Sequence, residues 1–344
     1  MIERVLIVGL GSIGKRHVRL IRELIPNVQI IVLRHKSCQN LSGVDIDNCV
    51  TNLTDALAFQ PQAAIIANPA SYHIDVALSL AKAGVHLLIE KPISNTSQGV
   101  LELIEICRSQ DVTLMTAYNL RFLPSLQYFR ELIMNRHMGQ AISVRAEIGQ
   151  YLPSWRPDTD YRQTVSAKAA LGGGVLLELS HEFDYLRWLF GEVEWVSANC
   201  LKQSDLQIDV EDTVHVLLGF TQRSGKSKLV ASLNMDFVRH DTTRICTVIG
   251  KKGSLRWNAL LGTVEYFEQD SKSWEVLYEH QHQRDDSYRA EWKHFLACIN
   301  EDRTPEITGH DGLAVLKIIE AAHYSSVNKT SEVKISKDKS GVSK

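Results

Sequence analysis

Short apolar runs alternate with amphipathic segments over the first third of the chain. The run at 5–8 is continuously apolar, which is typical of a buried strand, and a helical pattern follows at 15–24. The same alternation predicts further strands at 29–33, 63–67, 85–89 and 112–117, and helices at 72–82 and 96–108. Strands and helices that alternate in this way form a parallel sheet with helices on both faces.

The pattern changes after residue 118. A helix near 124–134 leads to a strand at 141–148, and a polar, aromatic loop follows at about 151–170. One long helix is predicted from about 175 to 189. Strand-like runs then follow one another without helices between them, at 195–201, 213–220, 228–235, 244–249 and 263–267, joined by short turns such as 223–225. Consecutive strands indicate a largely antiparallel sheet. Two further helices are predicted after these strands, at about 288–299 and 312–325.

The expected fold class is therefore α/β with two domains, for which 344 residues are sufficient. Residues 1–118 form a doubly wound parallel sheet, that is, a Rossmann domain. Residues 119–335 form an α+β domain with a large, mostly antiparallel open sheet. The polar tail at 336–344 is expected to be frayed.

Composition narrows the range of partners. Lys and Arg number 38 and Asp and Glu number 40, so the formal charge is −2, which argues against nucleic acid or an anionic membrane as a partner. No apolar stretch approaches the ~20 residues of a membrane span, and the first apolar run stops too early for a signal peptide. The six scattered cysteines predict neither a disulfide framework nor a zinc site, so a reducing cytoplasm is the expected location.

A glycine-rich turn directly follows the first strand. In the G-x-G-x-x-G pattern, Gly9 permits the tight turn, Gly11 lets a pyrophosphate approach the backbone, and Gly14 allows close packing of helix and strand. The amides at the start of the helix, including those of Ser12 and Ile13, then face the phosphates. The alternative is an ordinary strand-to-helix turn, but the strand before and the helix after favour a dinucleotide site.

The end of the second strand bears on the choice of cofactor. An NAD site usually has Asp or Glu at this point, which accepts a hydrogen bond from the ribose 2′-hydroxyl. This chain has Arg34 and His35, with Ser37 close by. A cation and a hydroxyl suit a 2′-phosphate and favour NADP over NAD, while a solvated basic strand end is the alternative.

Polar residues also follow the strand at 63–67. Asn68 and Pro69 lead into a helix that includes His73. Since ligands of open α/β sheets bind at the carboxyl ends of the strands, these residues are expected to border the cofactor. Ser71 is also placed to cap the helix that follows.

A lysine follows the next strand. Lys91, between Glu90 and Pro92, would project into the crevice that holds the nicotinamide, because Pro92 cannot continue the sheet. An ammonium group there could hydrogen-bond an oxygen that changes between hydroxyl and carbonyl. A surface lysine is the alternative, and taken alone it would be the more common case.

A glycine run at 172–174 precedes the predicted long helix. Glu178 and His181 are three residues apart and share a face, as do His181 and Asp184. Imidazole titrates near neutral pH and suits proton transfer coupled to hydride transfer. A packed surface helix is the alternative, and a metal site is not expected because only one such carboxylate–histidine pair is present.

These motifs in this order resemble the Gfo/Idh/MocA family of NAD(P)-dependent oxidoreductases. The likeness covers almost the whole chain. It is carried by the turn at 9–14, by Asn68-Pro69 with His73, by Glu90-Lys91-Pro92, by Asn119-Leu120-Arg121-Phe122, and by 172–184. The resemblance implies a Rossmann domain followed by an α/β domain whose open sheet builds the interface of a homo-oligomer, either a dimer or a tetramer.

The resemblance also implies roles for individual residues. The family's catalytic set corresponds by position to Lys91, Glu178 and His181, and its cofactor contacts extend to Glu90, Asn119 and Arg121. One spacing departs from the family pattern. The family places its catalytic acid four residues before the histidine, whereas here they are three apart, so the role of Glu178 is open.

Two further strings, at 151–157 and 160–162, look like a subgroup of the family associated with sugars of bacterial surfaces, including nonulosonic acids. An anionic sugar would suit them, because arginine binds carboxylate and phosphate in a bidentate manner. The expected substrate-binding residues are Trp155, Arg156, Tyr161, Arg162 and Asp184.

The sequence therefore predicts hydride transfer between a nicotinamide and a carbinol or carbonyl carbon of a sugar-like small molecule. Two alternatives stay open. One is a reductase of a non-sugar carbonyl or unsaturated compound. The other is a cofactor-binding regulator without turnover.

Overall fold

The computed structural model of the chain describes residues 2–35, 37–39, 41, 43–221 and 228–335. The chain forms two compact units. The first comprises Met1–Phe122, Ala170–Gly172 and Gln283–Leu316, and the second comprises Leu123–Ala169, Gly173–His282 and Lys317–Lys344. The two units do not follow the order of the chain, since Gln283–Leu316 pack with the N-terminal sheet.

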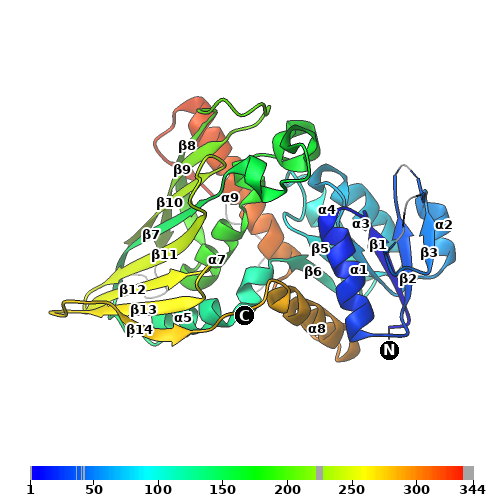
Figure 1. The fold of residues 1–344 in the computed structure, drawn as a ribbon, viewed down its shortest axis with the longest axis horizontal. Helices are drawn as coiled ribbons and strands as arrows, with labels where there is room; N and C mark the ends of the chain where they lie inside the picture. The colour runs from blue at the N-terminus through cyan, green and yellow to red at the C-terminus, as the bar shows by residue number, and fades with distance from the viewer. Residues whose placement is uncertain (1, 36, 40, 42, 222–227, 336–344) are drawn as a thin grey trace. The chain divides into compact units, whose positions relative to one another are not determined.

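The first unit contains a six-stranded, all-parallel sheet of order β3-β2-β1-β4-β5-β6 (Figure 1). Its strands are β1 Arg4–Val8, β2 Gln29–Leu33, β3 Asn48–Val50, β4 Ala63–Ile66, β5 His86–Glu90 and β6 Leu114–Ala117. The central strands are continuously apolar because both of their faces are covered, and Val5, Leu6 and Ile7 are fully buried. The predicted Rossmann domain is confirmed.

Helices cover both faces of this sheet. They are α1 Ser12–Leu24, α2 Leu53–Ala58, α3 His73–Lys82, α4 Val100–Ser109 and α8 Asp286–Asn300. α3 and α4 contact each other on one face, and α1 contacts α8 on the other (Figure 1). The chain order did not predict that α8 belongs here. The segment that follows α8 is attached to β6, because the Thr116 amide donates to the carbonyl of Ile307.

The second unit contains a nine-stranded sheet of order β14-β13-β12-β11-β7-β10-β9-β8-β15. Its strands are β7 Ala141–Gly149, β8 Val193–Leu201, β9 Thr213–Thr221, β10 Lys228–Asp236, β11 Thr243–Gly250, β12 Gly253–Asn258, β13 Thr263–Glu268, β14 Glu275–Glu279 and β15 Val333–Lys334. Only the pair β7–β10 is parallel. The predicted, mostly antiparallel sheet is confirmed, with β12, β14 and β15 added to the predicted strands.

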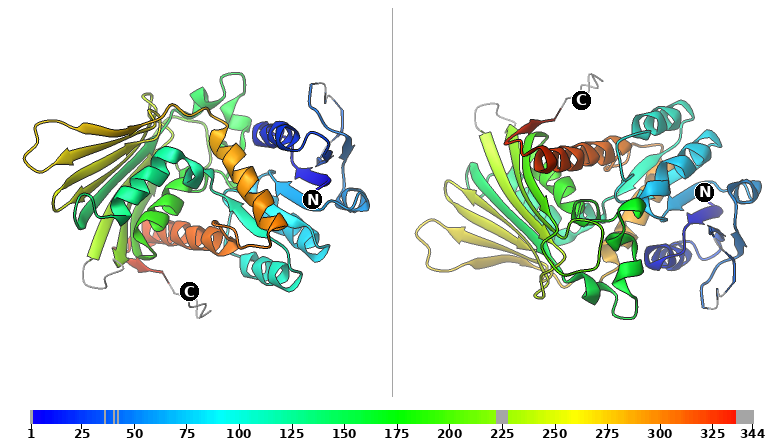
Figure 2. Two further views of the ribbon diagram at one scale, coloured as in Figure 1. Left: turned by 90° about the horizontal axis from the view of Figure 1, so that it is seen from below. Right: turned by 90° about the horizontal axis from the view of Figure 1, so that it is seen from above.

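Helices pack against one face of this sheet and leave the other face open (Figure 2). They are α5 Pro124–Met134, α6 Val175–Glu178, α7 His181–Phe190 and the C-terminal part of α9 Gly309–Asn328. The prediction of one continuous helix at 175–189 is wrong. The helix breaks at Leu179 and Ser180, where the Ser180 amide donates to Leu177 and the Glu182 amide to Leu179, as in a tighter 3₁₀ turn.

A disulfide joins Cys38 and Cys49, which corrects the prediction that the cysteines form none. Cys49 pairs with Val32 in the register of β2 and β3. The chain beyond β2 turns back beside β3 and brings the two Cα atoms to 5.7 Å, within the range of a disulfide. The two cysteines are eleven positions apart in the sequence, and no sequence spacing signals such a pair.

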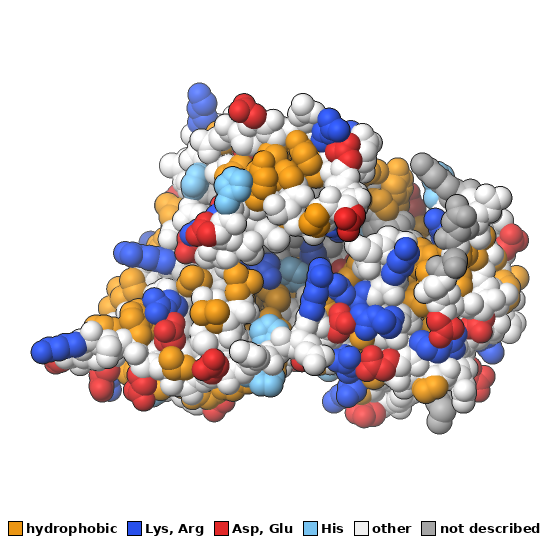
Figure 3. All heavy atoms as spheres, viewed as in Figure 1, with side chains coloured by type: hydrophobic (Ala, Val, Ile, Leu, Met, Phe, Trp, Pro, Cys, Tyr) orange, Lys and Arg blue, Asp and Glu red, His pale blue; other side chains and the backbone are white. Residues whose placement is uncertain are grey.

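The charges of the chain are interspersed on its surface. On the face drawn in Figure 3, acidic and basic side chains lie next to one another, in keeping with the near balance of their numbers. Among the helices of the described residues, none has the length and apolarity needed to cross a membrane. The predicted turn at 223–225 and the predicted frayed tail at 336–344 lie outside the described residues.

Candidate active site

Two glycines of the turn between β1 and α1 are required by the packing of the fold itself. Gly9 has a φ of +90°, and a Cβ there would lie 2.8 Å from the amide nitrogen of Asn68. A Cβ on Gly14 would lie 2.2 Å from the carbonyl oxygen of Gly9. Gly11 is different, because a Cβ there would meet no atom of the described residues within 4 Å. The fold does not need a glycine at Gly11, and the open space there leaves room for the predicted approach of a ligand to the backbone.

The start of α1 suits an anion. Gly11 is its N-cap and offers no side-chain acceptor, and the first turn contains no acidic residue. The partial positive charge of the helix start and the amides of Ser12 and Ile13 are thus left for a phosphate. The turn therefore fits the pyrophosphate of a dinucleotide.

A pair of alanine variants separates these roles. Gly11→Ala is expected to leave the melting temperature within about 2 °C of wild type but to weaken NADH binding at least about tenfold, because the new methyl group occupies the space that the pyrophosphate approaches. Gly14→Ala is expected to lower the melting temperature, because its methyl group meets the Gly9 carbonyl. Thermal unfolding and NADH fluorescence titration measure both. Equal NADH affinity in Gly11→Ala and wild type would contradict the phosphate assignment.

The end of β2 carries the predicted ribose contacts. Arg34 donates through Nη1 to the carbonyl of Gln39 at 3.2 Å, and the hydroxyl of Ser37 accepts from the Gln39 amide at 3.1 Å. His35 is exposed. The Cys38–Cys49 disulfide closes this segment against β3. Arg34 and Ser37 thus place two polar side chains close to the strand end.

The end of β4 carries buried polar atoms that fit a ligand. Asn68 Oδ1 and Ser71 Oγ are buried and have no hydrogen-bond partner among the described residues. Such atoms are costly unless a partner is supplied, and a bound cofactor is a source of one. These atoms border the glycine turn, since the Gly9 Cβ position lies against the Asn68 amide.

His73 is used inside the first unit. Its ring is buried and bridges the loops after β4 and β5, with Nε2 2.8 Å from the Asn68 carbonyl and Nδ1 3.1 Å from the Pro92 carbonyl. Burial lowers the pKa of His73, although the hydrogen bonds to Asn68 and Pro92 oppose this. Both ring nitrogens of His73 therefore face carbonyl groups of the first unit, and its contact with the cofactor stays a prediction.

Lys91 lies at the end of β5, where the Lys91–Pro92 peptide bond is cis. In the parallel order β1-β4-β5, the carboxyl ends of the strands meet at one edge of the sheet. Lys91 is thus on the same edge as the glycine turn, two strand spacings or about 10 Å along. The predicted phosphate site and the predicted catalytic lysine share this edge.

Glu90, before the lysine, is held by two neighbours. Its Oε1 accepts from His17 Nε2 at 2.9 Å, and its Oε2 accepts from the Lys91 amide at 3.1 Å. Burial raises the pKa of Glu90, but the hydrogen bond from His17 and the charge of Lys91 oppose burial, and the pKa is lowered overall. Both oxygens of the Glu90 carboxylate are therefore engaged within the protein.

A second buried carboxyl lies near Glu90. Glu291 on α8 is fully buried, and neither of its oxygens has a hydrogen-bond partner among the described residues. Burial, followed by the charge of Glu90, raises the pKa of Glu291 well above its ordinary value of 4.5. Glu90 is therefore the ionised member of this pair and Glu291 the protonated one.

The proton on Glu291 gives stability a pH dependence. The unfolded chain releases this proton above pH 4.5 while the folded protein keeps it, so the free energy of unfolding falls as pH rises above 4.5. We expect Glu291→Gln, which mimics the neutral acid, to raise the free energy of unfolding by about 1–2 kcal/mol at pH 8 and to change it little near pH 4. The exposed Glu301→Gln is the control. Denaturant unfolding at both pH values measures this, and an equal effect at both would contradict a protonated Glu291.

Asn119 and Arg121, two predicted cofactor contacts, are buried within the first unit. Asn119 Nδ2 donates to Ser287 Oγ at 2.8 Å. Arg121 donates to the Glu306 carbonyl at 3.3 Å and lies 3.4 Å from a carboxylate oxygen of Asp311. Ser287, Glu306 and Asp311 belong to the segment Gln283–Leu316, so both residues attach this segment to the end of β6.

In the second unit, the predicted catalytic pair lies at the break between α6 and α7. His181 begins α7 and is 8% exposed, and Glu178 ends α6, where its Oε1 accepts from Ser166 Oγ at 3.0 Å. Asp184 and Glu182 on α7 are buried, and Glu182 pairs with Arg244 at 3.0 Å. Since the helix breaks between them, the sequence argument for Glu178 and His181 on one face of a continuous helix no longer applies.

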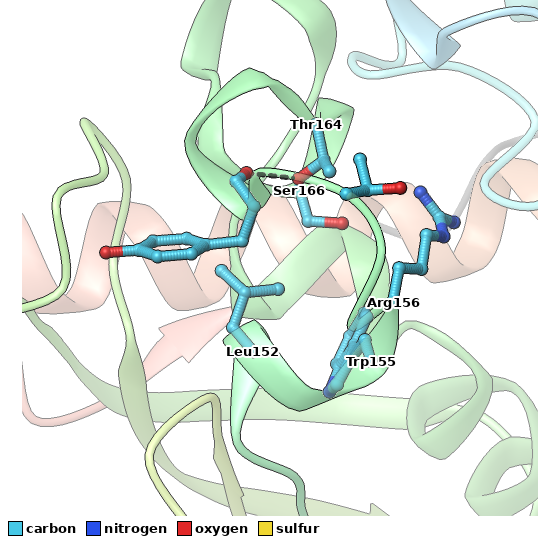
Figure 4. A pocket seen from close by; sticks show the side chains of 7 residues that line it. Leu152, Trp155, Arg156, Thr164 and Ser166 are labelled. Carbon is cyan, nitrogen blue, oxygen red and sulfur yellow. Dashed lines mark hydrogen bonds between the residues drawn. The ribbon is translucent and has the colours of Figure 1, made fainter.

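A small pocket lies in the loop between β7 and α6 (Figure 4). Its lining residues are Leu152, Trp155, Arg156, Thr159, Tyr161, Thr164 and Ser166. Three of the predicted substrate residues, Trp155, Arg156 and Tyr161, are thereby brought together. Ser166 joins this pocket to Glu178 through the hydrogen bond between their side chains.

The predicted substrate residue Arg162 has another partner. Its guanidinium makes two hydrogen bonds to the carboxylate of Asp160, at 2.8 and 2.9 Å, and its Nη1 donates to Gln207. The neighbouring carboxylate offsets its charge. Arg156 is therefore the better placed cation for an anionic group in this loop.

Sequence reasoning missed His17 and Trp292. Trp292 Nε1 donates to His17 Nδ1 at 2.8 Å, and both side chains are fully buried. The one available signal was a histidine on the buried face of α1, three residues after Gly14. Among the described residues, no three His, Cys, Asp or Glu side chains gather as a metal site would require.

Comparison with known proteins assigns the chain to a family. Residues 3–118 match the family model described as the oxidoreductase family, NAD-binding Rossmann fold, and residues 130–335 match the model of the oxidoreductase family's C-terminal alpha/beta domain. The chain belongs to the Gfo/Idh/MocA family of oxidoreductases. The resemblance inferred from the motifs is thereby confirmed, and with it the NAD-binding character of the first domain.

Relatives within the Gfo/Idh/MocA family include several dehydrogenases. The chain is 29% identical to the myo-inositol 2-dehydrogenase of Thermotoga maritima over 277 residues, 78% of each protein. It is 25% identical to the uncharacterized oxidoreductase YrbE of Bacillus subtilis over 335 residues, 93% of each. An uncharacterized oxidoreductase of Synechocystis sp. is 32% identical over 177 residues, which is 50% of this chain and 47% of that protein.

Solved structures show the same fold. A levoglucosan dehydrogenase in complex with NADH has a TM-score of 0.84 at 20% identity and covers 97% of this chain and 99% of its own. The WlbA dehydrogenase of Bordetella pertussis, in complex with NADH and UDP-GlcNAcA, has a TM-score of 0.80 at 21% identity and covers 98% of this chain and 100% of its own. At these identities the likeness establishes the fold alone.

Proposed function

We propose that this oxidoreductase transfers a hydride between NAD and a CH–OH or carbonyl carbon of a sugar, cyclitol or sugar-nucleotide-like substrate. The observation that carries the proposal is the shared edge of the parallel sheet, where the Gly9–Gly14 turn and Lys91 lie two strands apart. That edge offers a phosphate site and an ammonium group within the reach of one dinucleotide. Relatives named as inositol and levoglucosan dehydrogenases support the substrate class.

The cofactor would be held by the residues at this edge. The amides of Gly11, Ser12 and Ile13 would bind the pyrophosphate, and Asn68 Oδ1 and Ser71 Oγ would gain the partner that they lack among the described residues. When bound, the nicotinamide supplies hydride transfer; the protein positions it against the substrate.

Two side chains of this protein would handle the substrate's oxygen. Lys91 would donate a hydrogen bond to it and stabilise the negative charge that develops there. His181 would take the hydroxyl proton in oxidation and return it in reduction. Glu178 is proposed as the family's catalytic carboxylate, and its bond to Ser166 connects it to the loop pocket.

The loop pocket is the proposed site for the rest of the substrate. Trp155 and Leu152 provide apolar surfaces for a sugar ring, and Arg156 provides a cation for a carboxylate or phosphate (Figure 4). Asp184 is kept as a proposed substrate contact. A role in sugars of bacterial surfaces is a further proposal, which rests on the strings around Trp155 and Tyr161.

The proposal also covers the choice between NAD and NADP and the oligomeric state. A preference for NADP over NAD rests on Arg34 and Ser37 beside the end of β2. A homo-oligomer, either a dimer or a tetramer, would form through the open face of the nine-stranded sheet. Exposed apolar side chains such as Leu217 and Val230 lie on neighbouring strands of this sheet and support that interface.

The test is a turnover screen of the purified protein with NAD⁺ and NADP⁺ in turn. The candidates are myo-inositol, levoglucosan, UDP-GlcNAcA and a set of non-sugar alcohols and, with the reduced cofactors, non-sugar carbonyl compounds. Reduced nicotinamide that forms with one of the first three would support the proposal. Turnover of only the non-sugar compounds would overturn the substrate class, and NADH binding without turnover of any compound would favour a regulator.

A further inference from the structure

We propose that Trp292, His17 and Glu90 form a hydrogen-bonded chain that positions Lys91 for the hydride-transfer reaction. The inference rests on the proposed function of Lys91 and deepens it. It assigns positioning roles to a histidine of α1 and a tryptophan of α8, which lie 275 residues apart in the sequence.

The direction of every hydrogen bond in the chain is fixed by chemistry. An indole nitrogen can only donate, so Trp292 donates to His17 Nδ1 at 2.8 Å. The neutral ring of His17 must then carry its hydrogen on Nε2, which donates to Glu90 Oε1 at 2.9 Å. Glu90 Oε2 in turn accepts from the Lys91 amide at 3.1 Å. The tryptophan thus sets the tautomer that makes His17 a donor to the carboxylate.

Burial strengthens this chain. Trp292 and His17 are 0% exposed and Glu90 is 8% exposed. Hydrogen bonds in such surroundings are stronger than in water, and a missing partner is costly. Glu291 holds its own proton, as described above, so the negative charge of this buried cluster resides on Glu90 beside Lys91.

The chain constrains Lys91 in two ways. The hydrogen bond from its amide fixes the peptide between Glu90 and Lys91, directly before Pro92. The charge of Lys91 is also among the causes that lower the pKa of Glu90, so the carboxylate and the ammonium group attract each other. A side chain that must meet a reacting oxygen gains from such support, because small displacements reduce turnover strongly.

Packing alone does not account for these residue types. The neighbours of His17 on the buried face of α1 are Gly14, Val18 and Ile21. An apolar side chain there would avoid the desolvation of an imidazole and a carboxylate, which is seldom repaid in stability. The polar chain leads to Lys91, which indicates a role at the site.

A matched pair of tryptophan variants tests the inference. Trp292→Phe removes the N–H that fixes His17. Trp257→Phe removes an equally buried N–H, which donates to Ser125 Oγ at 3.0 Å in the second unit. We expect Trp292→Phe to lower kcat about 10- to 100-fold with KM and the Kd of NADH within about threefold of wild type, and Trp257→Phe to leave kcat within about threefold. Equal losses of kcat in the two variants would overturn the inference.

A second pair tests the chain through rescue. In His17→Gln the amide can still accept from Trp292 and donate to Glu90, whereas His17→Leu can do neither. We expect His17→Gln to retain at least about tenfold more turnover than His17→Leu, with similar NADH affinity in both. Equal turnover in the two variants would show that only packing matters at this position, and would overturn the inference.

Hydrogen exchange separates failure of the inference from failure of the proposed function. We expect the Lys91 amide to exchange about tenfold faster in Trp292→Phe and His17→Leu than in wild type or Trp257→Phe, whether or not a substrate is known. Unchanged exchange would overturn the chain itself. Faster exchange in a protein without turnover would support the chain and refute the proposed reaction instead.

Discussion

Lys91→Met is expected to lower kcat by about 10²- to 10³-fold while the Kd of NADH stays within about twofold of wild type. Methionine matches the length of the lysine side chain but cannot donate a hydrogen bond or carry charge. The phosphate site would be intact, because it is built from the backbone of the Gly9–Gly14 turn two strands away. Steady-state kinetics with the substrate from the turnover screen and a fluorescence titration with NADH measure the two effects.

Lys82→Met is the matched control, since Lys82 is an exposed lysine in the last turn of α3. It should turn over at the rate of wild type. If Lys91→Met retained the wild-type kcat, the lysine would have no part in the reaction. If NADH affinity fell together with kcat, Lys91 would be a cofactor ligand rather than a catalytic group.

His181→Asn is expected to lower kcat by about 10²- to 10⁴-fold, the usual contribution of a general acid or base. Asparagine keeps polarity and approximate size at the start of α7 but cannot exchange a proton near neutral pH. Binding of NADH should change little, because the glycine turn belongs to the first unit and His181 to the second. Single-turnover kinetics with preformed enzyme–NADH complex would assign the loss to the chemical step.

His280→Asn is its control, because His280 is exposed after β14 and has no proposed role in binding or catalysis. A loss of less than about threefold in His181→Asn would exclude the residue as general base or acid. In that case Glu178 would be the next candidate, and Glu178→Gln would be the variant to measure.

The sequence predicted the parallel sheet well, because its strands are fully buried apolar runs between clear helices. β1, β2, β4 and β5 lie within one residue of the predicted ranges. The same is true of β7 and β9 in the second unit, where apolar and polar positions alternate. In these strands the pattern of apolar and polar residues directly follows burial on one or both faces of the sheet, so the local sequence was sufficient to predict their bounds.

Other features depend on contacts between distant segments, and local patterns do not contain them. β3 is three residues long and lies at the edge of the sheet, where it pairs with β2. Its Cys49 forms a disulfide that the spacing of the cysteines in the sequence does not indicate. The break at Leu179 and Ser180 falls within an apolar helical pattern, so the periodicity continued across it. α8 reads as an ordinary amphipathic helix, yet its Trp292 is buried against His17.

The candidate site shows the same division. The positions of the glycine turn and Lys91 were predictable because each lies at the carboxyl end of a strand, a position that the fold class itself defines, while their roles stay predictions. Asn119 and Arg121 were expected at the cofactor, which stays a prediction, and their partners Ser287 and Asp311 are more than 160 residues away in sequence. Only coordinates reveal such partners.

The central claim is that Lys91 and His181 act on one substrate oxygen. The most direct measurement is a crystal structure of the protein with NADH and the substrate found in the turnover screen. The account predicts that Lys91 Nζ and a ring nitrogen of His181 each lie within about 3.5 Å of the same substrate oxygen. If the two nitrogens were instead more than about 10 Å apart in that complex, with only one of them near the substrate, the proposed mechanism would be contradicted.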